Sequence, residues 1–327
     1  MMNTIRAIDP GEVRFFSGSS NRPLAAAIAK HLGLPLDDTR IIRFSNDNLY
    51  IQLGVSVRSR SVFIVQTLSP PVNDHLMELL MMLDIARSAA AKEVHAVIPY
   101  FSFARSDKKD APRISITARL VADLLEAAGA THVMTMTVHS PQVHGFFSVP
   151  TDPLTARFLF TDHFRQRDLT STIVVTPDAG GAKSAARFAG SLGLPSAYGN
   201  KERVSDTHVS ISGLMGSPIQ GYKRALIYDD EIATGGSVME LCRILVEQGI
   251  GEIWVSCTHG VFTANAFARL ASVPQITEIV STDTVSIPEE RRPPNLRILS
   301  VAPVFGEAIR RNYSHASIGG LFTFGEG

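Results

Sequence analysis

The amino-acid sequence predicts an α/β protein made of two similar domains, each with a mainly parallel sheet flanked by helices. Short apolar runs rich in β-branched residues alternate with longer amphipathic segments, which is the pattern of repeated strand–helix–strand units. The length of 327 residues suits about two domains. A repeated spacing indicates duplication, since each half has a helix cap, a helix end and a strand that finishes in histidine. The matched positions are Thr117, Gly129 and His139 in the first half and Ser237, Gly249 and His259 in the second.

Strands are expected where short apolar runs are bounded by polar or glycine-containing segments. They are Val62–Gln66, Val94–Pro99, His132–Thr137, Thr172–Thr176, Ala225–Tyr228, Ile253–Cys257 and Glu278–Ser281. Helices are expected where apolar residues recur with helical spacing. They are Pro23–Leu32, Asp74–Ala91, Ile116–Ala128, Lys183–Leu192, Ser237–Gln248 and Phe305–Asn312. For the helix after Tyr228, Ser237 suits the N-cap and Gly249 suits the C-terminal cap.

The boundary between the two domains is expected at the Pro-Thr-Asp-Pro-Leu segment, Pro150–Leu154, because paired prolines interrupt regular structure. The first domain then covers residues 1–152, and the second covers residues 153–304. With 45% hydrophobic residues, the chain can bury a sizeable core.

The composition indicates a cytoplasmic protein that binds neither nucleic acid nor membranes. Lys and Arg together number 31, as do Asp and Glu, so no net charge attracts a phosphate backbone or anionic lipid. No apolar run approaches the roughly 18 residues of a membrane helix. The first residues also contain no apolar segment typical of a secretory signal. Cys242 and Cys257 lie in apolar stretches and are expected to be small core residues.

The stretch Tyr228–Ser237, YDDEIATGGS, is the strongest candidate for a binding site. It connects an expected strand to an expected helix, and open α/β sheets bind ligands at the carboxyl ends of their strands. Its glycines let backbone N–H groups approach a phosphate, and Thr234 and Ser237 can donate hydroxyl hydrogen bonds. Asp229 and Asp230 would repel that phosphate but can accept hydrogen bonds from a neighbouring sugar diol. The stretch therefore indicates a sugar-phosphate site, with an ordinary solvated loop as the alternative.

A second glycine loop, Thr176–Lys183, also follows an expected strand and opens an expected helix. It can cradle a second phosphate group, and Asp178 can give Mg²⁺ a hard oxygen ligand. His139 lies past the end of another strand, where a catalytic and a structural role are both open. Neither a Walker A motif nor a Gly-x-Gly-x-x-Gly turn occurs in the chain.

Two basic segments are further candidates for binding phosphates. Tyr100–Arg113 mixes aromatic residues with cations such as Arg105, which suits stacking on a base and contact with a polyphosphate. Lys201 and Arg203 can stabilise charge on a phosphoryl group during transfer. Each segment, taken alone, is also typical of a solvated surface loop.

Taken together, these segments resemble the ribose-phosphate pyrophosphokinases of the phosphate-activated class, also called phosphoribosyl pyrophosphate synthetases. The resemblance runs nearly from end to end, with its motifs in the family's order. The motifs are FSGSSNRPLAAAIA, RFSNDN, PPVNDHLMELLMMLDIAR, PYFSFARSDKKDAPRISITARLVADLL, VHSPQVHGFFSVPTD, VVTPDAGGAKSAARFA, NKERV, IYDDEIATGGS, CTHGVF and GEAIRRNYSHASIGGLF. The YDDEIATGGS stretch alone would also fit a type I phosphoribosyltransferase.

This resemblance implies two type I phosphoribosyltransferase-like domains, with a C-terminal helix at residues 305–323 packed on the first. It implies Mg²⁺-dependent transfer of the diphosphoryl group of ATP to O1 of ribose 5-phosphate, which gives 5-phosphoribosyl 1-pyrophosphate and AMP. It also implies a homo-oligomer of dimers assembled into a hexamer, with nucleotide sites that span subunits.

The resemblance further implies a role for individual residues. Lys201 and Arg203 are the catalytic basic pair. The ribose 5-phosphate site comprises Asp229, Asp230, Ala233, Thr234, Gly235, Gly236 and Ser237. The pyrophosphate loop comprises Asp178, Ala179, Gly180 and Gly181. The ATP site comprises Phe44, Asn46, Asn48, Arg105, Ser106 and His139, and the metal ligands are His139 and Asp178.

The chain departs from the family's usual motifs mainly near the nucleotide. The usual Phe-Ser-Asp-Gly-Glu is Phe-Ser-Asn-Asp-Asn at Phe44–Asn48, so two carboxylates become amides, which donate hydrogen bonds as well as accept them. Ser106 stands where Gln is common, and Thr137 and Ala233 each stand where Asp is common. These departures leave a non-catalytic regulatory homologue of a synthetase as an alternative, alongside a phosphoribosyltransferase.

Overall fold

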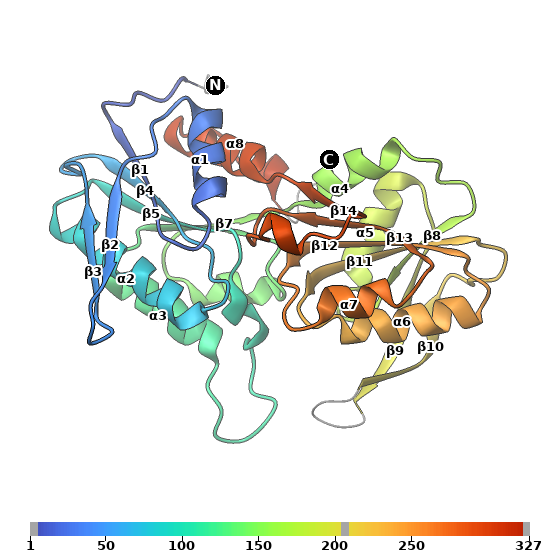
Figure 1. Cartoon of the computed structure of the whole chain (residues 1–327). Coiled ribbons are helices and arrows are strands. Elements are labelled where there is room, and N and C mark those ends of the chain that lie inside the picture. The colour runs from blue at the N-terminus through green and yellow to red at the C-terminus, as the bar shows by residue number, and fades with distance from the viewer. Residues whose placement is uncertain (1–5, 204–208, 323–327) are drawn as a thin grey trace. The chain divides into compact units, whose positions relative to one another are not determined.

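The computed structural model describes residues 6–203 and 209–322, without the side chains of residues 201–203 and 209–210. The chain forms two compact units, each built around its own sheet (Figure 1). In the described part of the chain, no helix is long and apolar enough to cross a membrane.

The two units are not simple halves of the chain. The first contains the chain up to Thr155, together with Thr284–Ser286 and the segment from Ser300 onward. The second contains Ala156–Asp283 and Ile287–Leu299. The last helix therefore belongs to the first unit, although it follows the second unit in the sequence.

The first unit is built on a five-stranded parallel sheet. In spatial order its strands are β1 (Val13–Ser17), β4 (Ser61–Val65), β5 (Glu93–Ile98), β6 (His132–Met136) and β7 (Thr151–Leu154). Two pairs of helices cover its two faces (Figure 1): α1 (Arg22–Leu32) and α8 (Ala302–Tyr313) on one, α2 (Val72–Ser88) and α3 (Thr117–Ala128) on the other. Helices α1 and α8 pack against each other, so the C-terminal helix completes the first unit.

A separate antiparallel hairpin, β2 (Thr39–Arg43) and β3 (Leu49–Leu53), lies beside this sheet. Its base is anchored by apolar contacts, because the buried Ile51 joins the core that α2 and α3 form with the sheet. Its tip carries two exposed aromatic residues, Phe44 and Tyr50.

The second unit is built on a seven-stranded sheet in which β10 alone runs antiparallel to its neighbour. In spatial order its strands are β10 (Val209–Gly216), β9 (Ser196–Arg203), β8 (Thr172–Thr176), β11 (Arg224–Ile232), β12 (Glu252–Gly260), β13 (Ile276–Thr282) and β14 (Leu296–Leu299). Helices α4 (Arg157–Arg165) and α5 (Ala182–Leu192) cover one face, and α6 (Gly236–Glu247) and α7 (Ala266–Ala271) cover the other (Figure 1).

Aromatic residues fill the face of this sheet that α4 and α5 cover. The rings of Phe188 and Tyr228 stack with centroids 4.3 Å apart, and those of Phe164 and Trp254 stack at 5.6 Å. Burial raises the pKa of Tyr228 to about 12, so its phenol stays protonated at neutral pH.

The strands and helices expected from the sequence are all present, and most of their ends differ by a few residues. The C-terminal helix expected at residues 305–323 is shorter, because α8 ends at Tyr313 and only a short 3-10 turn, Gly319–Leu321, follows it. Cys242 and Cys257 are buried free thiols, which confirms their expected core position. The expected caps at Ser237 and Thr117 are wrong, because Gly235 occupies the N-cap position of α6 and Ile116 occupies that of α3. The expected hinge at Pro150–Leu154 is largely occupied by the edge strand β7. Proline is tolerated there because one side of an edge strand needs no backbone N–H donor for the sheet.

Candidate active site

Two glycine loops lie at one edge of the second sheet because they follow neighbouring parallel strands. Strands β8 and β11 pair directly, with Thr172 opposite Arg224 and Val175 opposite Ile227. The loop after β8 leads into α5, and the loop after β11 leads into α6 (Figure 1). Since parallel strands place their carboxyl ends at the same edge, the two loops share one potential ligand-binding edge.

Acidic side chains of the two strands interact at this edge. Burial, followed by the charges of Asp230 and Asp178, raises the pKa of Asp229 well above its usual range. The backbone N–H of Asp230 donates to Oδ1 of Asp229 over 2.9 Å, which opposes part of that shift. Acidic groups in such proximity favour a bound proton, a cation or the hydroxyl donors of a sugar.

The start of α6 has the shape of an anion cradle. Gly235 has a φ of 76°, in the left-handed region that residues with a side chain rarely adopt. Thr234 and Gly236 on either side of it are exposed. The first N–H groups of a helix lack intrahelical partners, and the helix N-terminus carries positive partial charge. A ligand phosphate therefore fits the turn that opens α6.

Residues that follow β12 fix the backbone of this turn. The N–H of Thr263 donates to the carbonyl oxygen of Ala233 over 2.9 Å. Nη1 of Arg269, on α7, donates to the carbonyl oxygen of Thr234 over 3.2 Å. Neither supporting residue could be recognised from the sequence, because Arg269 lies 35 residues along the chain from Thr234 and no local motif links them.

The loop after β8 requires glycine at one position. A Cβ added to Gly181 would lie 2.4 Å from Oγ1 of the buried Thr176, so a side chain there forces the loop to move. The N–H of Gly181 also donates to Oδ1 of Asp178 over 3.3 Å. The two intervening residues, Ala179 and Gly180, are exposed. The loop therefore has a fixed shape with an accessible backbone, as a phosphate-binding loop requires.

The carboxylates at this edge suit a magnesium ion that is shared with a substrate. Mg²⁺ prefers oxygen ligands and usually binds one or two carboxylates together with substrate phosphates. Asp178, Asp229 and Asp230 supply such oxygens. Within residues 6–203 and 209–322, no three His, Cys, Asp or Glu side chains form a group able to hold a metal ion alone. Water and the phosphate oxygens of a substrate would complete the coordination of a magnesium ion held there.

The first unit holds three of the predicted ATP-binding residues past the ends of the paired strands β5 and β6. Arg105 ends the short 3-10 helix η1 (Ser102–Arg105) and is exposed, and His139 after β6 is exposed too. The Ser106 hydroxyl accepts a hydrogen bond from the N–H of Thr117 over 3.2 Å. Ser106 thus binds the first backbone N–H of α3, a structural contact that the local sequence does not indicate. The two predicted metal ligands, His139 and Asp178, belong to different units.

The other three predicted ATP-binding residues lie at the tip of the β2–β3 hairpin. Phe44, Asn46 and Asn48 are all exposed. The N–H of Phe44 donates to the carbonyl oxygen of Asn48 over 2.8 Å, and the N–H of Asn48 donates to Oδ1 of Asn46 over 3.3 Å. An exposed aromatic ring beside two amides suits a flat heterocycle with donors and acceptors on its edge.

The predicted catalytic pair lies at the end of β9. The backbone of Lys201 is opposite Ile211, and that of Arg203 is opposite Val209, in the antiparallel pairing with β10. The side chains of Lys201 and Arg203 lie outside the described residues, so their catalytic role stays a prediction.

Comparison with known proteins decides the family. The family described as the N-terminal domain of ribose phosphate pyrophosphokinase matches residues 13–129, and the phosphoribosyl synthetase-associated domain matches residues 209–323. A putative ribose-phosphate pyrophosphokinase of Streptomyces coelicolor is 51% identical over 311 residues, 95% of this chain and 98% of that protein. The chain belongs to the ribose-phosphate pyrophosphokinase family.

Other members of the ribose-phosphate pyrophosphokinase family agree with this assignment. The ribose-phosphate pyrophosphokinase of Deinococcus radiodurans is 48% identical over 313 residues, 94% of this chain and 97% of that protein. The crystal structure of phosphoribosylpyrophosphate synthetase from Mycobacterium smegmatis matches with a TM-score of 0.86 at 32% identity, over 93% of this chain and 100% of that one. These matches confirm the family resemblance, the predicted two-domain α/β fold and the prediction of an enzyme.

Proposed function

We propose that this member of the ribose-phosphate pyrophosphokinase family transfers the diphosphoryl group of ATP to O1 of ribose 5-phosphate. A bond forms between O1 and the β-phosphorus, while the bond from the β-phosphorus to the oxygen shared with the α-phosphorus breaks. O1 loses its proton, and AMP leaves with the electron pair of the broken bond. The products are 5-phosphoribosyl 1-pyrophosphate and AMP.

The observation that carries the proposal is the pair of glycine loops on neighbouring strands, with carboxylates between them. The turn Ala233–Ser237 would hold the 5-phosphate at the positive end of α6. Asp229 and Asp230 would accept hydrogen bonds from the two ring hydroxyls. The loop Asp178–Gly181 would then receive the diphosphoryl group next to C1.

The chemistry depends on alignment and on neutralised charge, because phosphoryl transfer needs little covalent help from the protein. The fixed loops orient O1, and the basic side chains of Lys201 and Arg203 would stabilise negative charge on the transferring group. Mg²⁺ bound through Asp178 and the substrate phosphates, with His139 as the further ligand predicted from the family, would neutralise part of that charge.

For ATP itself, we assign residues of the first unit. Arg105, Ser106 and His139 would lie beside the phosphates, with the Ser106 hydroxyl already bound to the first backbone N–H of α3. Phe44 would stack on the base, and Asn46 and Asn48 would bond its edge. Because amide side chains both donate and accept hydrogen bonds, these two residues can bind the edges of more than one purine base. By family membership we further propose a cytoplasmic homo-oligomer of dimers assembled into a hexamer.

The proposal is tested by incubating the purified protein with Mg²⁺, ribose 5-phosphate and a panel of nucleoside triphosphates. We expect a nucleoside monophosphate to form only when the sugar phosphate is present. Absence of turnover with every triphosphate, together with tight binding to an active synthetase, would instead identify a regulatory homologue.

A further inference from the structure

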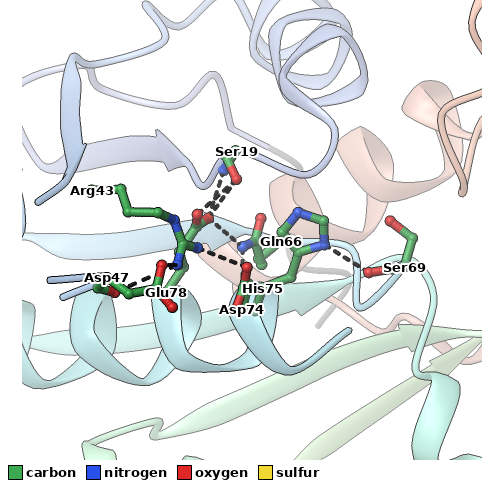
Figure 2. A network of polar contacts seen from close by, with 8 residues as sticks. All are labelled: Ser19, Arg43, Asp47, Gln66, Ser69, Asp74, His75 and Glu78. Carbon is green, nitrogen blue, oxygen red and sulfur yellow. Dashed lines mark hydrogen bonds and ion pairs between the residues drawn. The ribbon is translucent and has the colours of Figure 1, made fainter. Parts of the chain in front are cut away.

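Arg43, the last residue of β2, bridges two carboxylates that lie far apart in the sequence. Its Nη1 donates to Oδ1 of Asp47 over 2.6 Å, and its Nη2 donates to Oδ2 of Asp74 over 2.7 Å. Figure 2 shows the guanidinium between the hairpin tip and the first turn of α2. Hydrogen bonds and charges of both carboxylates raise the pKa of Arg43 further above its ordinary range. We call these three residues the Arg43 bridge.

The helix end of the bridge is fixed by buried polar contacts. His75, next to Asp74, is buried and donates Nδ1–H to the carbonyl oxygen of Ser69 over 2.7 Å. One turn later the buried Glu78 accepts hydrogen bonds from Ser19 and from Gln66, whose Nε2 lies 2.8 Å away (Figure 2). Because these contacts tie the start of α2 to the loops after β1 and β4, Asp74 is a rigid attachment point.

At the hairpin tip, the bridge ends at Asp47, which has an unusual backbone conformation. Asp47 has a φ of 69°, in the left-handed region, and its N–H donates to the carbonyl oxygen of Phe44 over 2.9 Å. Asp is among the few residues that tolerate this region. In this conformation its carboxylate meets Arg43. The bridge therefore links the turn that carries Phe44 directly to α2.

The ring of Phe44 lies at the exposed end of this link. Phe44 is 51% exposed, and its nearest aromatic neighbour, Tyr50, is 40% exposed with a centroid 6.2 Å away. Apolar contacts anchor the hairpin at its base, through Ile51, but not at the exposed tip. A ring on a loose tip would lose conformational freedom when it stacks on a ligand, and that loss lowers affinity.

We infer that Arg43 is a positioning residue for the nucleotide, acting through Asp47 and Asp74 to hold the hairpin tip ready for the base. This inference rests on the proposed function, in which Phe44, Asn46 and Asn48 contact the base. The bridge belongs to the first unit and the sugar-phosphate loops belong to the second, so we expect it to affect binding of the nucleoside triphosphate and not the chemical step.

The test is a comparison of Asp74→Asn and Asp47→Asn with the wild-type enzyme, in the full chain. Each amide keeps the size of the side chain and removes one charge from the bridge. We expect KM for ATP to rise about threefold to tenfold, with kcat and KM for ribose 5-phosphate within twofold of wild type. Asp84→Asn is the matched control, because Asp84 on the same helix pairs with the exposed Arg87 over 2.6 Å. We expect it to leave all three constants unchanged.

Two variants of Arg43 separate positioning from stability. Arg43→Lys keeps the charge and one of the two contacts, so it should restore part of the ATP affinity that Arg43→Gln loses. Unchanged KM for ATP in the Asp74 and Asp47 variants, or equal loss of kcat and of affinity for both substrates, would overturn the inference. Failure of the proposed function would look different, because the wild-type protein itself would then form no AMP from ATP and ribose 5-phosphate.

Discussion

Gly181→Ala is expected to impair the pyrophosphate loop by a steric clash with Thr176. A second substitution, at Thr176, should relieve that clash. The added Cβ would lie 2.4 Å from Oγ1 of Thr176, whereas atoms of this kind pack at about 3.5 Å. Thr176 is buried at the end of β8, so the loop must move by about 1 Å. Overpacking of this kind costs about 1–3 kcal/mol of stability. A shift of about 1 Å in a positioning loop lowers kcat/KM about 100-fold.

The assay is formation of AMP that depends on ribose 5-phosphate, alongside thermal unfolding to show that each variant folds. In Gly181→Ala with Thr176→Ala, the hydroxyl is gone, and kcat/KM should return to within about tenfold of wild type. In Gly181→Ala with Thr176→Val, a methyl group takes the place of the hydroxyl, and the loss should persist. Full activity of Gly181→Ala, or equal activity of the two double variants, would refute the steric explanation.

Three further predictions concern residues of the second unit. Gly235→Ala places a side chain at a φ of 76° and should cost about 1–2 kcal/mol with a higher KM for ribose 5-phosphate. Gly249→Ala, at a φ of 89° beyond the other end of α6, should cost similar stability and leave KM unchanged, and equal effects on KM would contradict this. The pKa of Asp229 is raised by burial and by neighbouring carboxylates, so the folded protein loses stability as pH rises above about 4. Asp229→Asn, measured without Mg²⁺ or substrates, should therefore raise the melting temperature more at pH 8 than at pH 4. The same variant should lower activity. The same pH profile in variant and wild type would argue against a raised pKa. Lys201→Ala should lower kcat about 1,000-fold and leave binding of ribose 5-phosphate, measured by calorimetry, nearly intact; a parallel loss of binding would exclude a transition-state role.

The buried parallel strands could be predicted from the sequence because each is a continuous apolar run. The hairpin strands β2 and β3 could not, since Thr39–Arg43 contains no fully buried residue. A strand is expected around Ala197–Tyr198, but the polar Asn200-Lys201-Glu202-Arg203 hides the full length of β9. The edge strand β7 contains Pro153, which argues against a strand when only the sequence is read. Periodicity therefore identified the core strands and missed the strands at edges and in hairpins.

The phosphate loops of the site could be predicted because glycine after a strand and before a helix is a local signal. The supports of those loops could not be predicted, because they depend on distant residues. Arg269, 35 residues from Thr234, binds the carbonyl oxygen of Thr234. The hairpin tip is supported in the same way, because Asp74 lies 31 residues from its partner Arg43. The predicted cap at Ser237 was wrong for a local reason, because the left-handed Gly235 occupies the cap position two residues earlier.

The proposed reaction requires the β- and γ-phosphoryl groups to move together from ATP to the sugar. ATP labelled with ³²P at the γ-position, or at the α-position, tests this directly in the presence of Mg²⁺ and ribose 5-phosphate. We expect the γ-label to appear in 5-phosphoribosyl 1-pyrophosphate and the α-label in AMP, in equal amounts. Release of the γ-label as free phosphate, or formation of ADP with a singly phosphorylated O1, would contradict it.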